Sequence, residues 1–429
     1  MIWFTPFWIW FFAIYGAIIG VTTLIVVITA AIGLRQIEDL SLAAWDAAPN
    51  HERLASEANT SHPRLTVIVP ALNEEEAIGA SLGSLLEQDY DNLEVIAVND
   101  RSTDSTGEIM ERMAAAASSA RISANQSSAG VPPAVARATS PALFKVIHIT
   151  ELPPGWLGKP HAMWTAAKEA TGEWLLFTDA DVMFRSDSLR RAVAYAEHEH
   201  ADHLVLAPTM LAMNMGERMI TAMIQMAMIA LRPWKVRDPH SKAFIGWGAF
   251  NMARRRAYDG IGTMESLRLQ VVEDMELGRR IKRAGFASRF ATGPGLVQIR
   301  WGRGALGPVR NLTKNAFAGM GFRLWLVFLV VLATLAFHVV PFIAVWFVPG
   351  WTKLGFAVEL AALFWIYFRL RHLYNISPGY FLLNPVAGLL MAYAMLRSLV
   401  VTLRQGGIVW RGTKYSIEEL RRASTNLWD

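Results

Sequence analysis

The chain has 429 residues, of which 53% are hydrophobic and 18% charged, and its formal net charge is +5. A mean hydropathy of +0.27 is too apolar for a purely soluble protein of this length. The absence of cysteine excludes disulfides, thiolate metal sites and cysteine nucleophiles. The excess of basic residues favours phosphates and anionic lipid headgroups as partners. Because these residues gather beside apolar segments, we expect no nucleic-acid partner.

The first 34 residues contain no Asp, Glu, Lys or Arg. The apolar run Phe7–Leu34 has about 28 residues, or roughly 42 Å as a helix, which is long enough to cross a bilayer with tilt. A cleaved signal peptide has a basic segment before its apolar core, whereas Arg35 follows the run here. We therefore predict a retained membrane anchor over 1–35, with its N-terminus outside, and a linker over 36–62.

The segment 63–303 alternates short β-branched runs with longer amphipathic stretches. This alternation is typical of βαβ units, so we expect an α/β domain with a mostly parallel sheet and helices on both faces. A first strand is predicted at Leu65–Val69, ended by Pro70, and a helix from Asn73 to Gln88. A second strand is predicted at Leu93–Val98.

Acidic and amide side chains follow three of the predicted strands. Asn73 and Asp100 follow the first two, and Asp179 follows the apolar run Trp174–Phe177. Ligands bind at the carboxyl ends of strands in open α/β sheets, so we expect these side chains to line one crevice. Asp181 projects to the same side of an extended chain as Asp179. This pair suits Mg²⁺ or Mn²⁺ holding a diphosphate.

Two segments of this domain are less regular. Residues 113–142 are rich in Ala and Ser and contain Pro132-Pro133, so we expect a flexible insertion without chemistry. The Met-rich segment Leu204–Leu231 is strongly apolar but contains Glu217 and Arg218. It fits either a core strand followed by a helix, or an amphipathic helix on the bilayer.

The rest of the chain returns to membrane-like composition. A basic interfacial segment is predicted over 304–323, and membrane spans within 324–404 at Leu324–Val348, Leu354–Phe368 and Phe381–Leu403. Three full crossings would export the basic tail 405–429, which we expect on the cytoplasmic side. One of the three is therefore expected to be re-entrant or interfacial. Glu359, inside the second span, is either a functional polar site or a helix contact.

Five motifs of the predicted α/β domain occur in a fixed order. They are Val69–Glu75, Val98–Asp104, Gly158–Ala162, Thr178–Asp181 and Val272–Asp274. In this order they resemble the family 2 glycosyltransferases, and the resemblance covers most of 63–303. It implies a GT-A fold, which binds nucleotide sugars, and a transferase that uses a nucleotide-diphosphate sugar.

The resemblance also assigns a nucleotide site. Asp100 would accept the imide N–H of uracil and so favour a uridine nucleotide. Pro70, Ala71, Asn73 and Glu74 would shape the base pocket. Without the other motifs, Asp100 would more simply be a cap of its loop.

Three residues are candidates for binding the diphosphate of the donor. Asp181, with Asp179 beside it, would hold Mg²⁺ or Mn²⁺ on the departing diphosphate, and Asp179 would also contact the donor. Lys159 follows a glycine and is either a diphosphate contact or a solvated surface lysine.

The acceptor side is assigned to residues further along the chain. Asp274 matches the position of the catalytic base in the family, and Glu273 is expected to support it. Gly248 would let the backbone approach the sugar or acceptor closely. Trp247 would stack on a sugar face, or serve as a core or membrane-interface tryptophan.

Arg300 and Trp301 resemble the end of the Gln-x-x-Arg-Trp motif of processive polysaccharide synthases. Val297 occupies the Gln position, a departure that weakens the processive interpretation. Arg300 remains a candidate phosphate contact and Trp301 a substrate contact.

Two further stretches, Pro153–Lys159 and the tail piece Val409–Tyr415, resemble hopene-associated, carotenoid-type and ceramide glycosyltransferases. These relatives imply a lipid hydroxyl acceptor, transfer with inversion, and a multi-pass protein of the bacterial inner membrane with a cytoplasmic catalytic domain. Two alternatives remain open. One is a processive polysaccharide synthase, and the other is a non-catalytic membrane protein that senses nucleotide sugars.

Overall fold

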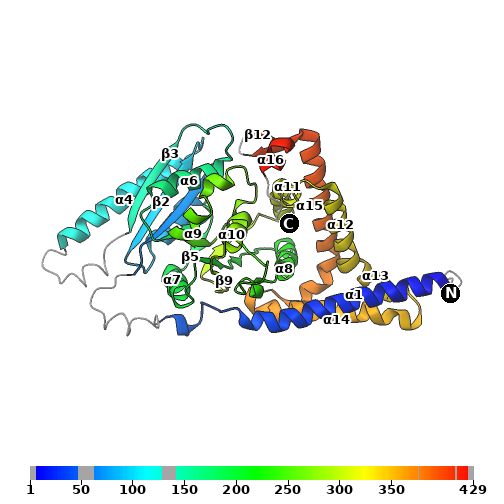
Figure 1. Ribbon diagram of the computed structural model, residues 1–429. Helices are drawn as coiled ribbons and strands as arrows, with labels where there is room; N and C mark the ends of the chain where they lie inside the picture. Colours follow the sequence, from blue (N-terminus) through cyan, green and yellow to red (C-terminus); the bar gives the residue numbers. More distant parts are fainter. Residues whose placement is uncertain (1–5, 47–61, 128–141, 375, 411–412, 424–429) are drawn as a thin grey trace.

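The structure, a computed structural model, describes residues 6–46, 62–127, 142–374, 376–410 and 413–423. An α/β domain lies on one side, and a group of long apolar helices lies on the other (Figure 1). The predicted fold class, a mostly parallel α/β sheet with helices and apolar helices at both ends, is confirmed.

A seven-stranded sheet forms the centre of the domain, in the order β3-β2-β1-β4-β8-β6-β9. Strands β1 to β4 are mutually parallel, whereas β8 is antiparallel to both of its neighbours. All residues of β1 are buried, as a parallel strand covered on both faces requires. The strands are β1 (Leu65–Ala71), β2 (Leu93–Asp100), β3 (Leu143–Ile149), β4 (Trp174–Phe177), β6 (His203–Leu206), β8 (Asn251–Arg254) and β9 (Ser288–Ala291).

The two predicted strands are present, but the prediction that Pro70 ends the first is wrong. Strand β1 continues to Ala71. Its pairing with β4 ends at Ile68, while its pairing with β2 continues beyond that residue. A proline is therefore placed where the strand has a neighbour on one side only, as the missing N–H requires.

Helices cover both faces of the sheet, as predicted. Val67 and Val69 of β1 belong to the core on one face, and Ile68 belongs to the core on the other. The helices of the domain are α3 (Ile78–Leu86), α4 (Thr106–Ser127), α6 (Gly158–Glu169), α7 (Ser188–His198), α8 (Met215–Ala230), α9 (Arg255–Gly260) and α10 (Glu273–Arg283).

Two predictions about this layer are wrong. The helix expected from Asn73 begins at Ile78, because the N–H groups of Glu74 and Glu75 donate to Thr106 and Asp104 instead of starting a helix. The flexible insertion expected over 113–142 is helical up to residue 127, where α4 ends. The Ala-rich composition of that stretch favours helix. Residues 128–141 lie outside the described part of the chain.

A small sheet of β5 (Met183–Phe184), β10 (Val297–Ile299) and β7 (Thr209–Met210) lies beside the main one. The ambiguous Met-rich segment contains strands β6 and β7 followed by helix α8. The Asn214 side chain caps α8 by accepting the N–H of Glu217 at 3.0 Å. Helix α8, which follows β7, therefore also packs on the apolar helices through Met219 and Met223.

The apolar group begins with α1 (Pro6–Gly33), and within the described residues Pro6–Gln36 and Pro378–Gln405 are each long and apolar enough to cross a membrane. The span predicted at Leu324–Val348 is a helix pair bent by 44°. The remaining helices are α11 (Leu306–Gly319), α12 (Leu324–His338), α13 (Val340–Phe347), α14 (Lys353–Tyr374), α15 (Asn384–Gln405) and α16 (Ile417–Ala423). A hairpin of β11 (Gly407–Trp410) and β12 (Thr413–Ser416) precedes α16.

Short 3-10 helices complete the described elements. They are η1 (Leu34–Gln36), η2 (Ala43–Trp45), η3 (Pro233–Lys235), η4 (Met264–Leu267), η5 (Gly350–Thr352) and η6 (Pro378–Leu383).

Helices α1 and α14 pack closely along their length. A Cβ at Gly20 would lie 2.6 Å from the carbonyl oxygen of Gly355, so glycine is required for this approach. Glu359 is buried at the same interface, where Thr23 hydrogen-bonds it. Its placement supports the helix-contact interpretation of this acid.

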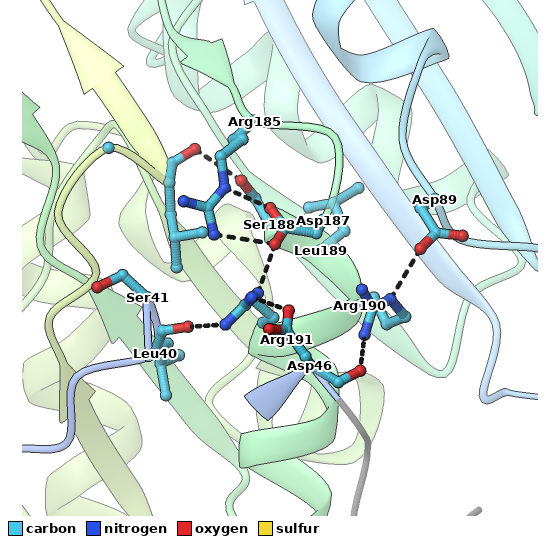
Figure 2. A network of polar contacts seen from close by, with 12 residues as sticks. Leu40, Ser41, Asp46, Asp89, Arg185, Asp187, Ser188, Leu189, Arg190 and Arg191 are labelled. Atoms are coloured by element: carbon cyan, nitrogen blue, oxygen red, sulfur yellow. Dashed lines mark hydrogen bonds and ion pairs between the residues drawn. The ribbon is translucent and has the colours of Figure 1, made fainter. Parts of the chain in front are cut away.

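The segment after α1 lies against α7 (Figure 2). The buried Arg191 donates to the carbonyl oxygens of Leu40 and Leu42 at 2.8 and 2.7 Å, and to Asp187 at 2.5 Å. It also pairs with Asp46. The first part of the predicted linker, up to residue 46, is therefore held on the domain, and residues 47–61 lie outside the described residues.

Candidate active site

The predicted donor residues come together around the side chain of Lys159, in the first turn of α6. Its Nζ lies 2.6 Å from an oxygen of Asp179 and 2.6 Å from an oxygen of Glu273. Burial alone would lower the pKa of Lys159, but the negative charges of Asp179, Glu273 and Asp274 outweigh it and raise the pKa above its ordinary value. Lys159 thus joins the acids after β4 to those of α10, and it is not a solvated surface lysine.

Asp179 and Asp181 follow β4 at the carboxyl edge of the parallel strands. The Asp181 side chain reaches solvent, yet withdrawal of water by the surrounding protein and the charge of Asp179 raise its pKa to about 6. Within the described ranges, no three acidic or histidine side chains converge as a ready-made metal cage. The raised pKa of Asp181 reflects crowding of negative charge beside Asp179, which fits a divalent cation that takes its remaining oxygen ligands from a donor diphosphate.

Asp274 lies in the first turn of α10, close to the donor residues. Its Oδ2 accepts the N–H of Gly248 at 2.9 Å, and its Oδ1 accepts the N–H of Met275 at 2.8 Å. Burial, followed by the charge of Glu273, raises the pKa of Asp274 above its ordinary value. A half-buried acid with a raised pKa is the kind of group that general acid–base catalysis uses.

The segment from Gly246 to Asn251 packs against the backbone of Asp274. A Cβ at Gly246 would lie 1.8 Å from the backbone oxygen of Asp274. The side-chain amide of Asn251 donates to the same oxygen at 3.0 Å, and His203 in turn contacts Asn251 at 2.7 Å. Sequence reasoning gave Asn251 no role of its own and missed His203, because Asn251 acts on a backbone oxygen and His203 acts through Asn251.

Gly248 connects the two acidic groups of the site. Its N–H donates to Asp274, and its carbonyl oxygen accepts the N–H of Asp179 at 2.9 Å. A Cβ at this glycine would lie 2.6 Å from Oδ2 of Asp179. The backbone of Gly248 therefore fixes the position of Asp179 relative to Asp274.

The predicted nucleotide residues lie around the ends of β1 and β2. Asp100 is fully buried and accepts hydrogen bonds from Nε and Nη2 of Arg101 at 2.8 and 3.3 Å. Asn73, with a positive φ of 54°, accepts the N–H of Thr103 at 2.8 Å. The guanidinium on Asp100 was missed, because neighbours in sequence do not ordinarily face one another at a strand end.

The remaining nucleotide and acceptor residues have structural contacts as well. Pro70 and Ala71 are buried in β1, and the N–H of Glu74 donates to Thr106 at 2.8 Å. Trp247 and Trp301 are half-buried and pack against the main core of the domain. Both tryptophans lie at the rim of the core and not in its interior.

Arg300 does not point to solvent but to a buried acid. Its Nη2 lies 2.8 Å from Glu217, which also accepts the N–H groups of Gly304 and Met213 at 2.7 Å each. The hydrogen bond from Arg300 lowers the pKa of Glu217 to about 2. A lone glutamate in an apolar Met-rich segment was the sequence signal for this contact, but its partner could not be predicted.

Two cavities lie at the edges of the α/β domain. One, of about 600 Å³, lies between the domain and the apolar helices and is lined by Leu211, Met213, Arg218, Arg371 and Ile376, among others. The second, of about 630 Å³, lies between Arg101, the 150–156 loop and the C-terminal hairpin. Both place apolar-helix or tail residues beside the α/β domain.

The tail also reaches the acidic side of the site. Lys314 of α11 lies over the ring of Trp410 in β11, with Nζ 4.4 Å from the ring centre. Its positive charge lowers the pKa of Asp181, against the stronger raising effects of burial and Asp179. A membrane-side cation is therefore close enough to act on the candidate metal position.

Comparison with known proteins identifies the domain. Residues 66–262 match the family described as Glycosyl transferase family 2. The 4,4'-diaponeurosporenoate glycosyltransferase of Staphylococcus aureus strain USA300 is 25% identical over 230 residues, which cover 53% of this chain and 54% of the relative. The counterpart from strain N315 is 24% identical over 230 residues with the same coverage. The chain thus spans about half the length of the curated relatives it matches.

Two solved structures are also similar to the chain. The mannosyltransferase PcManGT from Pyrobaculum calidifontis, in complex with GDP-Man and Mn²⁺, is 20% identical with a TM-score of 0.46, covering 87% of this chain and 99% of that one. S. aureus TarS 1–349 with UDP is 17% identical with a TM-score of 0.36, covering 80% and 92%. The family match thus assigns residues 66–262, a little under half of the chain, to the glycosyl transferase family 2.

Proposed function

We propose that the chain is an inverting glycosyltransferase of a bacterial inner membrane. It moves a sugar from a nucleotide-diphosphate sugar, a UDP-sugar by preference, to the hydroxyl group of a membrane lipid. One observation carries the proposal: the backbone of Gly248 holds the acids after β4 on one side and the acid of α10 with a raised pKa on the other. The acids after β4 would serve the sugar donor, and Asp274 would serve the acceptor hydroxyl.

On the donor side, Asp181 and Asp179 would hold Mg²⁺ or Mn²⁺, which stabilises the departing diphosphate when it is bound. Lys159 pairs with Asp179 and so keeps a positive charge at the point where the diphosphate leaves. Asp100, at the end of β2, would receive the base of the nucleotide. The Arg101 guanidinium on Asp100 has to rotate away for a uracil imide to take its place.

On the acceptor side, Asp274 would take the proton of the acceptor hydroxyl as the oxygen bonds to the anomeric carbon. The bond from that carbon to the diphosphate breaks in the same displacement, so the configuration inverts. Gly248 and Asn251 hold the residue in position through its side chain and its backbone. A base of this kind contributes roughly 10²–10⁴-fold to the rate.

The cavity of about 600 Å³ supports a lipid acceptor. It opens between the domain and the apolar helices, and Leu211 and Met213 on its wall are 38% and 68% exposed. The relatives' name refers to diaponeurosporenoate, a carboxylate, so it does not by itself support a hydroxyl as the accepting group. A lipid acceptor would keep its chain in the bilayer while its polar end reaches the site.

The test measures nucleotide release by the detergent-solubilised full chain, supplied with UDP- and GDP-sugar panels, Mn²⁺ or Mg²⁺, and a total lipid extract. We expect release that needs both metal and lipid, and its loss in Asp181→Asn. The matched control is Glu108→Gln, an exposed acid on α4 outside the site. Release without lipid would point to polymer synthesis or hydrolysis, and no release with any donor would reject the transferase.

A further inference from the structure

Helix α15 and the preceding η6 together form the Pro378–Gln405 segment, which is long and apolar enough to cross a bilayer. We propose that this segment does not cross, but lies in the plane of the cytoplasmic membrane surface as a platform under the α/β domain. The sidedness in this proposal rests on the proposed function, which places the domain in the cytoplasm. The in-plane orientation rests on contacts within the chain.

The amino end of the platform helix contacts the α/β domain. Ala387 is fully buried in a cluster with Met219, Ile220 and Met223 of α8. Helix α8 follows directly on strand β7 and carries Glu217, the partner of Arg300. This end of the helix is therefore at the level of the domain.

The carboxyl end contacts the same domain. The chain leaves α15 into the β11–β12 hairpin, where the hydroxyl of Tyr415 donates to the carbonyl oxygen of Trp156 at 2.8 Å. Leu399 and Trp410 share a buried cluster with Leu157 and Val271 of the domain. Both ends of one helix thus meet a single α/β domain.

The length of the helix makes these contacts decisive. Its 22 residues span roughly 33 Å, about the thickness of the hydrocarbon core of a bilayer. If α15 crossed, its ends would lie on opposite sides of the membrane, and a domain touching both would have to enter the bilayer. Figure 1 shows α15 running along the side of the domain, in a different direction from α1.

The middle of α15 carries polar contacts that fit a surface position. The hydroxyl of Ser398 accepts the N–H of Phe317 at 3.0 Å, and Nε of Arg397 donates to Thr313 at 3.2 Å. Both partners belong to α11, the basic helix that also contains Lys314. An exposed arginine in this position is costly inside the hydrocarbon but is accommodated at the headgroup level.

The exposed apolar side chains of the platform form one stripe. They recur at intervals of three, four and seven residues, which places them on one face of a helix. The stripe consists of Leu382, Val386, Leu389, Tyr393, Val400 and Leu403. The opposite face is buried against the domain, α11 and α12 through Ala394, Ser398 and Thr402 among others. One protein face and one lipid face are what an in-plane helix needs.

Helices α1 and α14 behave differently, because only their carboxyl ends meet the domain. Val27 and Ala30 of α1 pack with Ile366 and Leu370 of α14 and with Trp234. Among the described residues, the amino ends of these helices pack on one another, as Trp10 does with Trp351. The Arg191 network then fixes the segment after α1 to the domain (Figure 2). These two helices are the inward crossings.

The resulting topology has three crossings: α1 inward, one outward within 324–348, and α14 inward. Helix α12 packs beside α15, so the turn outward comes at the bend into α13. Among the described helices, α14 is not a candidate span by length and composition, and its crossing rests on its close packing along α1. The platform helix and the tail then remain on the cytoplasmic side. This arrangement removes the parity problem of three C-terminal spans, and it keeps Arg404, Arg421 and Arg422 inside, as the positive-inside rule requires.

The chain has no cysteine, so a single introduced cysteine reports its own side of the membrane. The test pair is Ser377→Cys before the platform and Gln405→Cys at its end, both exposed positions. Glu108→Cys marks the domain side and Trp351→Cys marks the far ends of the crossings. A membrane-impermeant maleimide is applied to intact cells and to inverted vesicles, and detergent-solubilised protein verifies that each thiol reacts.

We expect the Ser377→Cys and Gln405→Cys variants to label only in inverted vesicles, together with Glu108→Cys, and Trp351→Cys to label in intact cells. Labelling of the test pair from opposite sides would overturn the proposal, and so would labelling of both with Trp351→Cys. The assay needs no turnover. A failure of the glycosyltransferase assignment would therefore leave this result intact, and the reverse also holds.

Discussion

At the scale of single residues, Gly248 is the position on which the site depends most. Its two backbone hydrogen bonds tie Asp179 to Asp274, and its Cα lies against the Asp179 carboxylate. No side chain at residue 248 fits without moving that carboxylate.

Gly248→Ala should lower the rate of sugar transfer by about 10²-fold, because a displacement of about 1 Å at reacting groups has this size of effect. Initial rates with saturating donor measure it. Gly83→Ala, where an added Cβ meets nothing within 4 Å, is the matched control and should keep wild-type activity. Equal activity of both variants would contradict the assigned role of the Gly248 backbone.

The pH dependence of transfer should report Asp274. A base works only when ionised, and burial with the charge of Glu273 raises the pKa of Asp274. The rate should therefore fall as pH drops through a value well above 3.8, the ordinary pKa of an aspartate. The measurement is kcat against pH under saturating substrates. A profile that stays flat down to pH 4 would show that Asp274 is not the base.

Arg101→Gly should strengthen UDP binding by about 5-fold. The change frees the Asp100 carboxylate from a competing charged hydrogen bond, and it removes a non-glycine residue from a φ of 61°. Calorimetric titration with UDP checks this, with Asp100→Asn as the control that should bind UDP more weakly than wild type. Weaker binding by Arg101→Gly would make the guanidinium itself a donor contact.

The acids of the site could be predicted because their spacing after strands is local information. Asp179 and Asp181 were proposed from the apolar run before them, whereas Asp274 was assigned by the resemblance to the base position of the family. Partners such as Arg101 for Asp100, or Glu217 for Arg300, depend on tertiary approach and were not predictable. The same holds for Asn251, which acts on a backbone oxygen of Asp274.

At the scale of elements, β1 and β2 could be predicted because a strand buried on both faces must be apolar throughout. The start of α3 could not. Three glutamates after Asn73 look like the acidic first turn of a helix, but the N–H groups of the first two, Glu74 and Glu75, donate to Thr106 and Asp104. The helix start suggested by these acidic residues is thus overridden by hydrogen bonds to a distant part of the chain.

Arg191 is the main connection between the segment after α1 and helix α7. Arg191→Met should lower the free energy of unfolding by about 3 kcal/mol, because it leaves Asp187 and two backbone carbonyls without their buried donor. Arg190→Met removes the contacts of Arg190 with the exposed Asp89 and with the backbone oxygen of Asp46, but leaves the buried Arg191 in place, and should cost about 1 kcal/mol or less. Denaturant unfolding followed by tryptophan fluorescence compares the two, and equal losses would contradict the clamp.

At the scale of the whole molecule, the cavity proposed for the acceptor lies between the α/β domain and the apolar helices. Strand β10 separates β5, which begins two residues after Asp181, from β7, which ends beside the cavity of about 600 Å³. Hydropathy predicted the membrane segments, but only tertiary contacts indicate which of them lies in the plane.

Met213→Asp should raise the KM for the lipid acceptor by about 10-fold and leave UDP binding unchanged, because it places a charge on the apolar wall of the cavity. Met215→Asp is the matched control, an exposed methionine two residues away that is not among the lining residues of the cavity. Kinetics in mixed micelles with varied lipid separate the two. An equal effect of both variants would remove the cavity from the acceptor path.

The most direct test of the central claim follows the labelled sugar of a nucleotide sugar into extracted lipid, with the wild type and Asp274→Asn side by side. The wild type should produce a glycolipid of inverted anomeric configuration. The variant should bind donor normally but transfer at least about 10²-fold more slowly. A product with retained configuration, or transfer by the variant at the wild-type rate, would contradict the claim that Asp274 drives a single displacement across the Gly248 backbone.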